Sequence, residues 1–268
     1  LVPLARVTMI AAAFLLGAGV WGAVAAVLVA EVIVLLVSFV VLMRFVHPDL
    51  RAGLRNIPGL LGFGAKVESA AALGYASYRV SLFAVAYYLG PDDIAFYAVA
   101  DGLIMQIGGL PMIIGTVLLP KISHSSGDQG SEMTAVAHRI TFFMIVCLVL
   151  VVALVGPWLV VGLYGQAYAP ALSVLWVLLI GVAFQSGSRV LAPYMVAVNR
   201  IDLQVLAQGV SLALQVVLLV IWIPRWGVVG AAWASATALV LRWVVYVIAF
   251  RIVSKVPLRQ TLLISTAD

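Results

Sequence analysis

The chain has 268 residues, of which 65% are hydrophobic and 9% are charged, and its formal net charge at pH 7 is +5. Soluble domains carry about 25% charged residues, so this composition excludes a protein whose whole surface faces water. Apolar runs of about 20 residues recur along the chain, which predicts membrane-spanning helices rather than barrel strands. Most Lys and Arg residues lie at the ends of these runs, as topology signals do, and therefore do not indicate nucleic-acid binding.

The apolar runs predict eight transmembrane segments, in chain order residues 2–18, 20–45, 59–89, 93–119, 139–163, 170–198, 203–223 and 228–253. The chain begins at Leu1 rather than at a methionine, which suggests a fragment or a trimmed chain. The polar stretch 123–132 predicts a loop. Because Lys and Arg gather on alternate loops, we expect both ends of the chain on the cytoplasmic side of a bacterial or archaeal plasma membrane.

One sequence pattern occurs twice. Gly19-Val20-Trp21-Gly22-Ala23 opens the second segment, and Gly227-Val228-Val229-Gly230-Ala231 opens the eighth. Six crossings separate them, so both copies have the same orientation, which predicts a parallel repeat about an axis along the membrane normal. The domain organisation that follows is residues 1–45 as the last two helices of an N-terminal lobe, 46–58 as a basic cytoplasmic linker, 59–254 as a six-helix C-terminal lobe and 255–268 as a cytoplasmic tail.

Charged residues inside a bilayer are costly and usually face a cavity or a partner. In the third segment, Glu68, Tyr75 and Arg79 share one helical stripe. Arg79 and Asp101 of the fourth segment both lie roughly 12–15 Å from the outer turn, at 1.5 Å per residue. They form either a structural ion pair across the hairpin or part of a substrate cavity. In the second segment, Glu31 is either a proton or sodium site or hydrogen-bonded to a neighbour.

Three later segments add basic and amide groups. Gln185 and Arg189 lie one turn apart in the sixth segment. Arg242 lies in the eighth, where it snorkels, faces a neighbouring helix or lines a cavity. The seventh carries a polar stripe of Gln204, Gln208, Ser211 and Gln215, which either bonds to other helices or forms a water-filled wall. Three arginines at mid-depth suggest a cationic cavity and an anionic cargo, because the planar guanidinium donates two hydrogen bonds at once to a phosphate or carboxylate.

The residue pattern contains nothing typical of an active site. The three histidines, His47, His124 and His138, fall in predicted loops or helix ends without metal-ligand spacing. No glycine-rich nucleotide loop is present, and the outer loops are too short to hold a polar catalytic centre. We therefore expect a transporter rather than an enzyme, with no cofactor and no metal, and with H⁺ or Na⁺ as the candidate coupling ions.

Several motifs carry a family resemblance. Ala95-Phe96-Tyr97-Ala98-Val99-Ala100-Asp101 leads through a helix to Leu118-Leu119-Pro120-Lys121-Ile122-Ser123. Leu163-Tyr164-Gly165-Gln166-Ala167-Tyr168, Asn199-Arg200 and the Gly227–Ala231 pattern follow in order. Together they resemble the polysaccharide flippases, of the O-antigen type, in the multidrug/oligosaccharidyl-lipid/polysaccharide exporter superfamily. Lipid II flippases are more distant, since many have Arg where this chain has Gly102.

The resemblance implies two six-helix lobes around a cationic cavity. It also implies the transfer of a lipid-linked oligosaccharide, usually on undecaprenyl diphosphate, from the cytoplasmic to the periplasmic leaflet for lipopolysaccharide or other surface glycans. Polysaccharide polymerase or ligase machinery is the expected protein partner. Two other readings stay open: a multidrug/cation antiporter of the same superfamily, and a scaffold subunit of a glycan-assembly complex that transports nothing.

These considerations give the candidate site residues. Substrate binding is assigned to Arg79, Arg189, Arg242, Gln185 and Tyr75. Charge balance or ion coupling is assigned to Asp101, Glu68 and Glu31.

Overall fold

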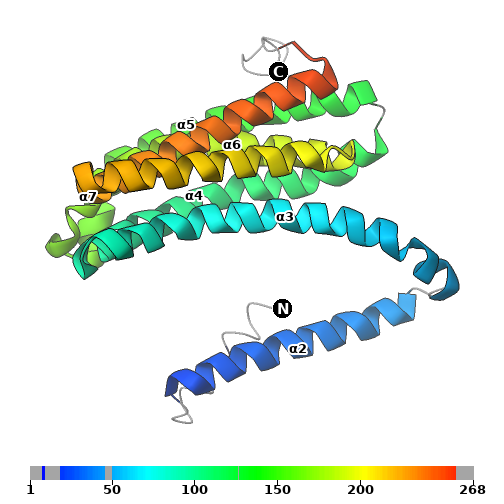
Figure 1. The fold of residues 1–268 in the computed structure, drawn as a ribbon, viewed down its shortest axis with the longest axis horizontal. Helices are drawn as coiled ribbons and strands as arrows, with labels where there is room; N and C mark the ends of the chain where they lie inside the picture. Colours follow the sequence, from blue (N-terminus) through cyan, green and yellow to red (C-terminus); the bar gives the residue numbers. More distant parts are fainter. Residues whose placement is uncertain (1–7, 10–18, 46–49, 126, 258–268) are drawn as a thin grey trace. The chain divides into compact units, whose positions relative to one another are not determined.

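The computed structural model describes residues 8–9, 19–45, 50–125 and 127–257, and every regular element within these ranges is a helix. The helices are α2 (Gly19–Phe45), α3 (Leu50–Tyr88), α4 (Pro91–His124), α5 (Gly127–Tyr164), the 3-10 helix η1 (Gln166–Tyr168), α6 (Ala171–Ala197) and α7 (Ile201–Ser254) (Figure 1). The all-α prediction is confirmed. Apolar sequences in lipid form helices because every backbone N–H and C=O must be bonded within the segment.

Of the described helices, α2, α4, α5, α6 and α7 are long and apolar enough to cross a membrane. The third predicted segment lies inside α3, which is not among these helices. The charged residues Lys66, Glu68 and Arg79 lower its mean hydropathy. The first predicted segment lies almost wholly outside the described residues. The chain is thus a multi-pass membrane protein, and the count of eight spans stays a prediction.

Helix α7 is two helices joined at Gly227, whose φ of 58° and ψ of −141° are not helical. A positive φ strains any residue with a Cβ, so glycine is the residue expected at this break. The two parts, residues 201–226 and 228–254, correspond to the predicted segments 203–223 and 228–253. The glycine pattern that opens the eighth segment therefore marks a turn between helices, as its sequence indicated.

The chain divides into two compact units, Leu1–Gly62 and Phe63–Asp268. In the first unit, α2 exposes most of its large apolar side chains, including Trp21 and Leu28. The predicted linker at 46–58 overlaps the start of α3 at Leu50, while 46–49 and most of the predicted tail lie outside the described residues. The division into a partial N-terminal lobe, a linker, a six-helix lobe and a tail therefore stays a prediction.

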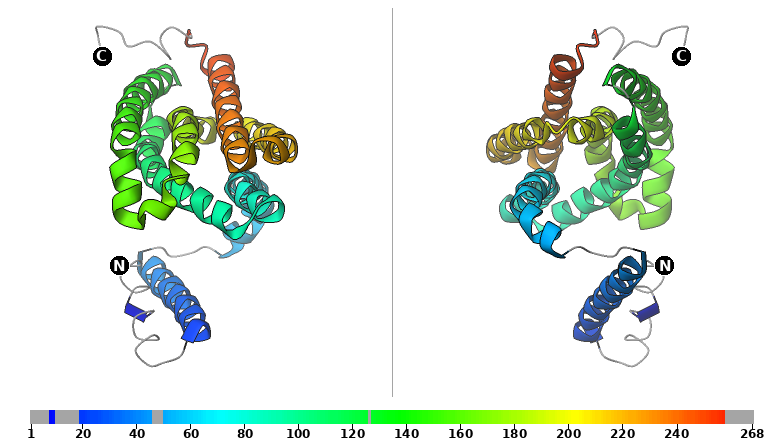
Figure 2. Two further views of the ribbon diagram at one scale, coloured as in Figure 1. Left: turned by 90° about the vertical axis from the view of Figure 1, so that its left-hand side faces the viewer. Right: turned by 90° about the vertical axis from the view of Figure 1, so that its right-hand side faces the viewer.

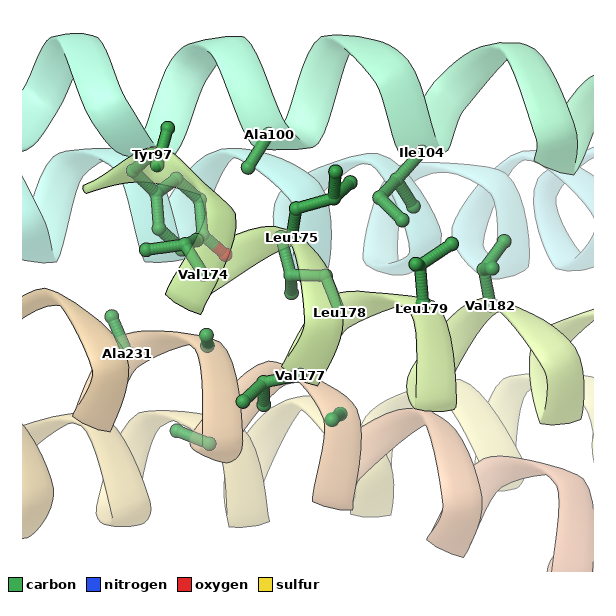
Figure 3. Close-up of a cluster of buried hydrophobic side chains, with 14 of the residues drawn as sticks. Tyr97, Ala100, Ile104, Val174, Leu175, Val177, Leu178, Leu179, Val182 and Ala231 are labelled. Atoms are coloured by element: carbon green, nitrogen blue, oxygen red, sulfur yellow. The ribbon is translucent and has the colours of Figure 1, made fainter. Parts of the chain in front are cut away.

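Helix α6 is the central element of the second unit. It packs against α4, α5 and α7, and most of its residues are buried (Figure 2). Its first half inserts Val174, Leu175, Leu178 and Leu179 into a core that also contains Tyr97 and other side chains of α4 (Figure 3). Small residues such as Ala231, Ala232 and Ala234 let α7 approach closely, as is common between helices in membranes.

The loop predicted at residues 123–132 is wrong. Helix α4 continues to His124, and α5 already begins at Gly127. Polar residues here sit on a helix with two faces: Ser131 and Thr134 are buried, whereas Glu132 is exposed. His138 is consequently not at a helix end but within α5, with only 1% of its surface exposed.

Candidate functional site

A pocket of about 750 Å³ lies within the second unit, between α3, α4, α6 and α7. Its walls are mixed. Apolar residues such as Met112 and Pro193 form one part, and polar residues of α6 and α7 form another. A cavity of this size, with few polar groups converging from several helices, is the usual form of a ligand site.

The charged side chains that line the pocket are Arg189 and Arg242, and none of the described lining residues is Asp or Glu. The pocket is therefore positively charged. Because charges in a low-dielectric interior are costly unless they are paired, two guanidinium groups without a carboxylate in the same pocket favour an anionic guest.

Arg189 is held in place by two neutral acceptors. One terminal nitrogen donates to the backbone oxygen of Gly108 in α4, and the other donates to the hydroxyl of Tyr78 in α3. A Cβ at position 108 would lie only 3.3 Å from Gln185 and 3.4 Å from Arg189. Glycine thus lets α4 come close enough for the guanidinium to reach the backbone. Gln185 donates to the same Tyr78 hydroxyl, so this tyrosine joins the two predicted residues.

Arg242 is buried, with 4% of its surface exposed, and its Nη2 donates to Ser77 Oγ over 2.8 Å. Ser77 in turn donates to Oε1 of Gln215. The Gln215 amide nitrogen donates to the Ser77 backbone oxygen at 2.9 Å and to Ser81 Oγ at 2.8 Å. Ser235 Oγ lies 2.7 Å from Ser81 Oγ. This neutral network between α3 and α7 fixes where the guanidinium lies.

The polar stripe on α7 serves both purposes that the sequence left open. Gln204 and Gln208 line the pocket, and Gln204 also donates to the backbone oxygen of Ala192 at 3.1 Å. Ser211 donates to the backbone oxygen of Ala238 at 2.7 Å, and Gln215 belongs to the network below the pocket. One end of the stripe therefore faces the pocket and the other end binds helices together.

Tyr75 lines the pocket, whereas Arg79 lies one turn further along α3 and is exposed. Arg79 donates to the Tyr75 hydroxyl from Nε at 3.1 Å and from Nη2 at 3.0 Å, and its guanidinium carbon lies 5.2 Å from the centre of the Tyr75 ring. These contacts hold Arg79 beside a residue that lines the pocket.

The three candidate acids lie outside the pocket lining. Asp101 in α4 is half-buried and is within electrostatic reach of Arg79, although no ion pair within 4 Å joins these two described side chains. Glu68 in α3 is exposed. Glu31 belongs to α2, in the other unit. Among the described residues, no group of three or more His, Cys, Asp or Glu side chains is arranged to hold a metal ion.

Sequence reasoning did not identify Tyr78, Ser77 or Ser188 as site residues. Tyr78 accepts hydrogen bonds from both Gln185 and Arg189, and Ser188 lines the pocket. The stripe drawn through Tyr75 and Arg79 does not include Tyr78, so that pattern gave no signal. For Ser188, the available signal was its position between Gln185 and Arg189 in the sequence.

Comparison with known proteins identifies the family. Residues 2–173 match a family model described as polysaccharide biosynthesis protein. The chain belongs to this family. Membership in the polysaccharide biosynthesis family confirms the resemblance to polysaccharide flippases that the motifs indicated.

Two similar proteins extend this finding. A candidate O-antigen transporter of Shigella flexneri is 25% identical over 233 residues, which are 82% of this chain and 55% of that protein. The lipid II flippase MurJ, in an inward closed conformation, has a structure similar to 97% of this chain and 57% of its own, with a TM-score of 0.72 and 14% identity. This chain and MurJ therefore share a fold. The chain spans about half the length of either relative.

Proposed function

We propose that this chain forms part of a flippase that moves a lipid-linked oligosaccharide from the cytoplasmic to the periplasmic leaflet for cell-surface polysaccharide synthesis. The observation that carries the proposal is a pocket between helices that contains two guanidinium groups and, among its described lining residues, no carboxylate. An oligosaccharide on undecaprenyl diphosphate is anionic and cannot cross hydrocarbon unaided, so it needs such a site. Family membership and the names of the two relatives support the same activity.

Arg79 and Arg189 would hold the anionic part of the substrate, either the diphosphate or an acidic sugar. A guanidinium suits both because it forms paired, charge-assisted hydrogen bonds with planar or tetrahedral oxyanions. Asp101 and Glu68 would hold or release the arginines during the cycle, with H⁺ or Na⁺ as coupling ion. An inside-negative membrane potential favours outward movement of an anion by about 2.3 kcal/mol per charge per 100 mV.

The proposed transport cycle is alternating access between two lobes. Residues 59–254 would be one six-helix lobe, residues 1–45 would belong to the other, and both ends of this chain would be cytoplasmic. A polysaccharide polymerase or ligase would act on the product. A multidrug/cation antiporter is disfavoured because its cavity is expected to contain acids, and the described lining of this pocket has none.

The test replaces Arg189 by Gln and by Lys in cells that make the full-length protein. Arg189→Gln should reduce surface glycan by tenfold or more, because it removes the charge, while Arg189→Lys should retain part of the activity. Arg225→Gln is the control, since Arg225 is exposed and distant in sequence from the pocket residues. Membrane levels of each variant are measured by immunoblot.

Normal glycan output from both Arg79→Gln and Arg189→Gln cells would contradict the proposed role of these arginines. Purified protein in liposomes separates transport from a scaffold function, because a scaffold leaves lipid-linked sugar in its original leaflet. A drug-resistance assay on the same cells distinguishes an antiporter.

A further inference from the structure

The three candidate arginines differ in how deeply they lie. Arg79 is exposed, Arg189 is half-buried, and Arg242 is buried with 4% of its surface exposed. All three belong to the second unit, and Arg189 and Arg242 line the same pocket. The two guanidinium groups of the pocket therefore differ in exposure, and that of Arg242 is almost closed off from solvent.

Arg242 has only neutral partners. Its Nη2 donates to Ser77 Oγ at 2.8 Å, whereas its Nε–H is buried and has no acceptor among the residues that the structure describes. The other charged residue of the pocket lining is Arg189, which is also positive. A buried guanidinium with an unused donor and no carboxylate in its pocket is costly to maintain unless an anion binds there. Planar carboxylates fit such a donor because they accept two parallel hydrogen bonds.

Apart from the two arginines, the polar residues that line the pocket carry uncharged amides or hydroxyls. Gln208 and Ser188 line the pocket, and Gln208 Oε1 and Ser188 Oγ are buried without a hydrogen-bond partner in the described part of the chain. The rings of Tyr78 and Tyr246 also line it. Amides and hydroxyls are suitable partners for sugar hydroxyl groups, since each donates and accepts hydrogen bonds. The pocket, whose deep end is defined by the buried Arg242, thus combines donors and acceptors for a sugar with a buried positive charge.

The order of groups in a lipid-linked oligosaccharide decides which of its anionic groups each arginine can reach. The prenyl chain stays in lipid, the diphosphate follows it, and the sugars come last. A molecule that enters this pocket sugar first places its diphosphate nearer the surface and a sugar at the deepest point. In that orientation the half-buried Arg189 would lie nearer the diphosphate, and the buried Arg242 would lie nearer the glycan.

We propose that the deep end of this pocket receives a sugar that bears an ionised carboxylate, and that Arg242 pairs with it. This inference rests on the proposed flippase function and makes the substrate class more specific: an acidic oligosaccharide of the hexuronic acid type rather than a neutral one. Arg242 is then a specificity-determining residue, and the Ser77–Gln215 network holds it in place.

The experiment uses the full-length protein in liposomes and pairs of prenyl-diphosphate-linked trisaccharides. The members of each pair differ only in whether one sugar is a glucuronic acid or a glucose, and the position of that sugar is varied among pairs. Wild-type protein should flip the acidic member of at least one pair about tenfold faster. Arg242→Gln should remove that advantage, so that the acidic and the neutral member of each pair are flipped at equal rates, whatever that common rate is. Arg251→Gln, at an exposed arginine near the end of the same helix, should change neither rate.

Each outcome separates the inference from the proposed function. If wild-type protein flips both members of every pair equally, the acidic-sugar proposal is wrong while the flippase function stands. If it flips no member of any pair, the flippase function itself fails. The wild-type comparison needs no variant, so it decides the proposal even if Arg242→Gln does not fold. A rise in the melting temperature of wild-type protein with sodium glucuronate, but not with glucose or NaCl at equal ionic strength, would support it independently.

Discussion

The two halves of α6 lie in one continuous helix but have opposite surroundings. The first half places Val174, Leu175 and Leu178 in a close-packed apolar core (Figure 3). The second half places Gln185 and Arg189 against an open pocket. Both halves are largely buried, so burial alone does not distinguish them. The difference is that side chains of neighbouring helices fill the space around the core half, whereas part of the space beside the pocket half is left open.

This contrast shows how a membrane helix combines rigidity with a binding site. In lipid, helices associate through packing and interhelical hydrogen bonds rather than through the hydrophobic effect. The core half supplies the packing that fixes α4 and α7 beside α6. The pocket half can then present polar groups to a ligand. Some of these groups have uncharged hydrogen-bond partners, and Ser188 Oγ has none among the described residues. Changes in the core half should lower stability, and changes in the pocket half should lower transport.

The largest expected effect lies at Gly187, which belongs to the pocket half but packs against the rings of Trp243 and His138 instead of lining the pocket. A Cβ here would lie 2.4 Å from Trp243 Nε1 and 2.6 Å from His138 Nε2. Gly187→Leu should lower the free energy of unfolding by more than about 3 kcal/mol, because overpacking displaces both rings. Thermal melting of the purified protein in lipid nanodiscs measures this loss. Gly102→Leu is the control, because nothing lies within 4 Å of a Cβ at that position. Equal melting temperatures for the two variants would contradict the packing described here.

A smaller loss of stability is expected from Leu175→Ala in the core half. Leu175 is fully buried, and its truncation leaves a cavity. Because lipid is about as apolar as the core, the transfer of the side chain from lipid contributes little to stability. The free energy of unfolding should therefore fall mainly through lost packing, by roughly 1–3 kcal/mol. Melting should fall accordingly, while flipping per folded molecule stays within about twofold of wild type. Leu154→Ala, at a leucine 71% exposed on α5, should change neither quantity. A selective loss of transport in Leu175→Ala would undermine the division between the halves.

Most of the helices were predictable from the sequence, and the reason is physical. Lipid allows a backbone few alternatives to a helix, so the predicted segment at 170–198 nearly coincides with α6 (Ala171–Ala197). The prediction failed at residues 123–132, where polar residues were taken as a loop. A helix that leaves the membrane meets water and carries polar residues without ending. His138 was misplaced for the same reason.

The site was predictable only where a residue is conspicuous in an apolar helix. Arg189, Arg242 and Gln185 stand out in this way, and all three line the pocket. Tyr78 and Ser77 do not stand out, because tyrosine and serine are ordinary residues of membrane helices. Their importance comes from which face of α3 meets α6 and α7, and this depends on tertiary packing that no single-helix pattern contains.

A still smaller effect should follow from Gln185→Leu in the pocket half. Gln185 donates to the Tyr78 hydroxyl that also accepts from Arg189. Loss of one hydrogen bond of about 0.5–1.5 kcal/mol should slow flipping roughly two- to tenfold, because Arg189 is less well positioned. The melting temperature should change less than in Leu175→Ala. Flipping rates in liposomes and nanodisc melting test both parts, with Gln166→Leu at the exposed η1 as control. A large drop in stability without slower flipping would place Gln185 with the core instead.

The smallest expected effect concerns the aromatic cluster that closes the core half next to the pocket. Trp243 Nε1 donates to His138 Nε2 at 3.1 Å, and its ring lies 5.1 Å from that of Phe184 in α6. Replacing either partner also changes ring volume, so the hydrogen bond is best measured by a double-mutant cycle of Trp243→Phe and His138→Phe. Interhelical hydrogen bonds in membranes average about 0.6 kcal/mol, and we expect a coupling free energy of that size. A value near zero would mean that this contact between α5 and α7 acts through ring packing alone, in which case the boundary between the two halves of α6 is set by shape and not by polarity.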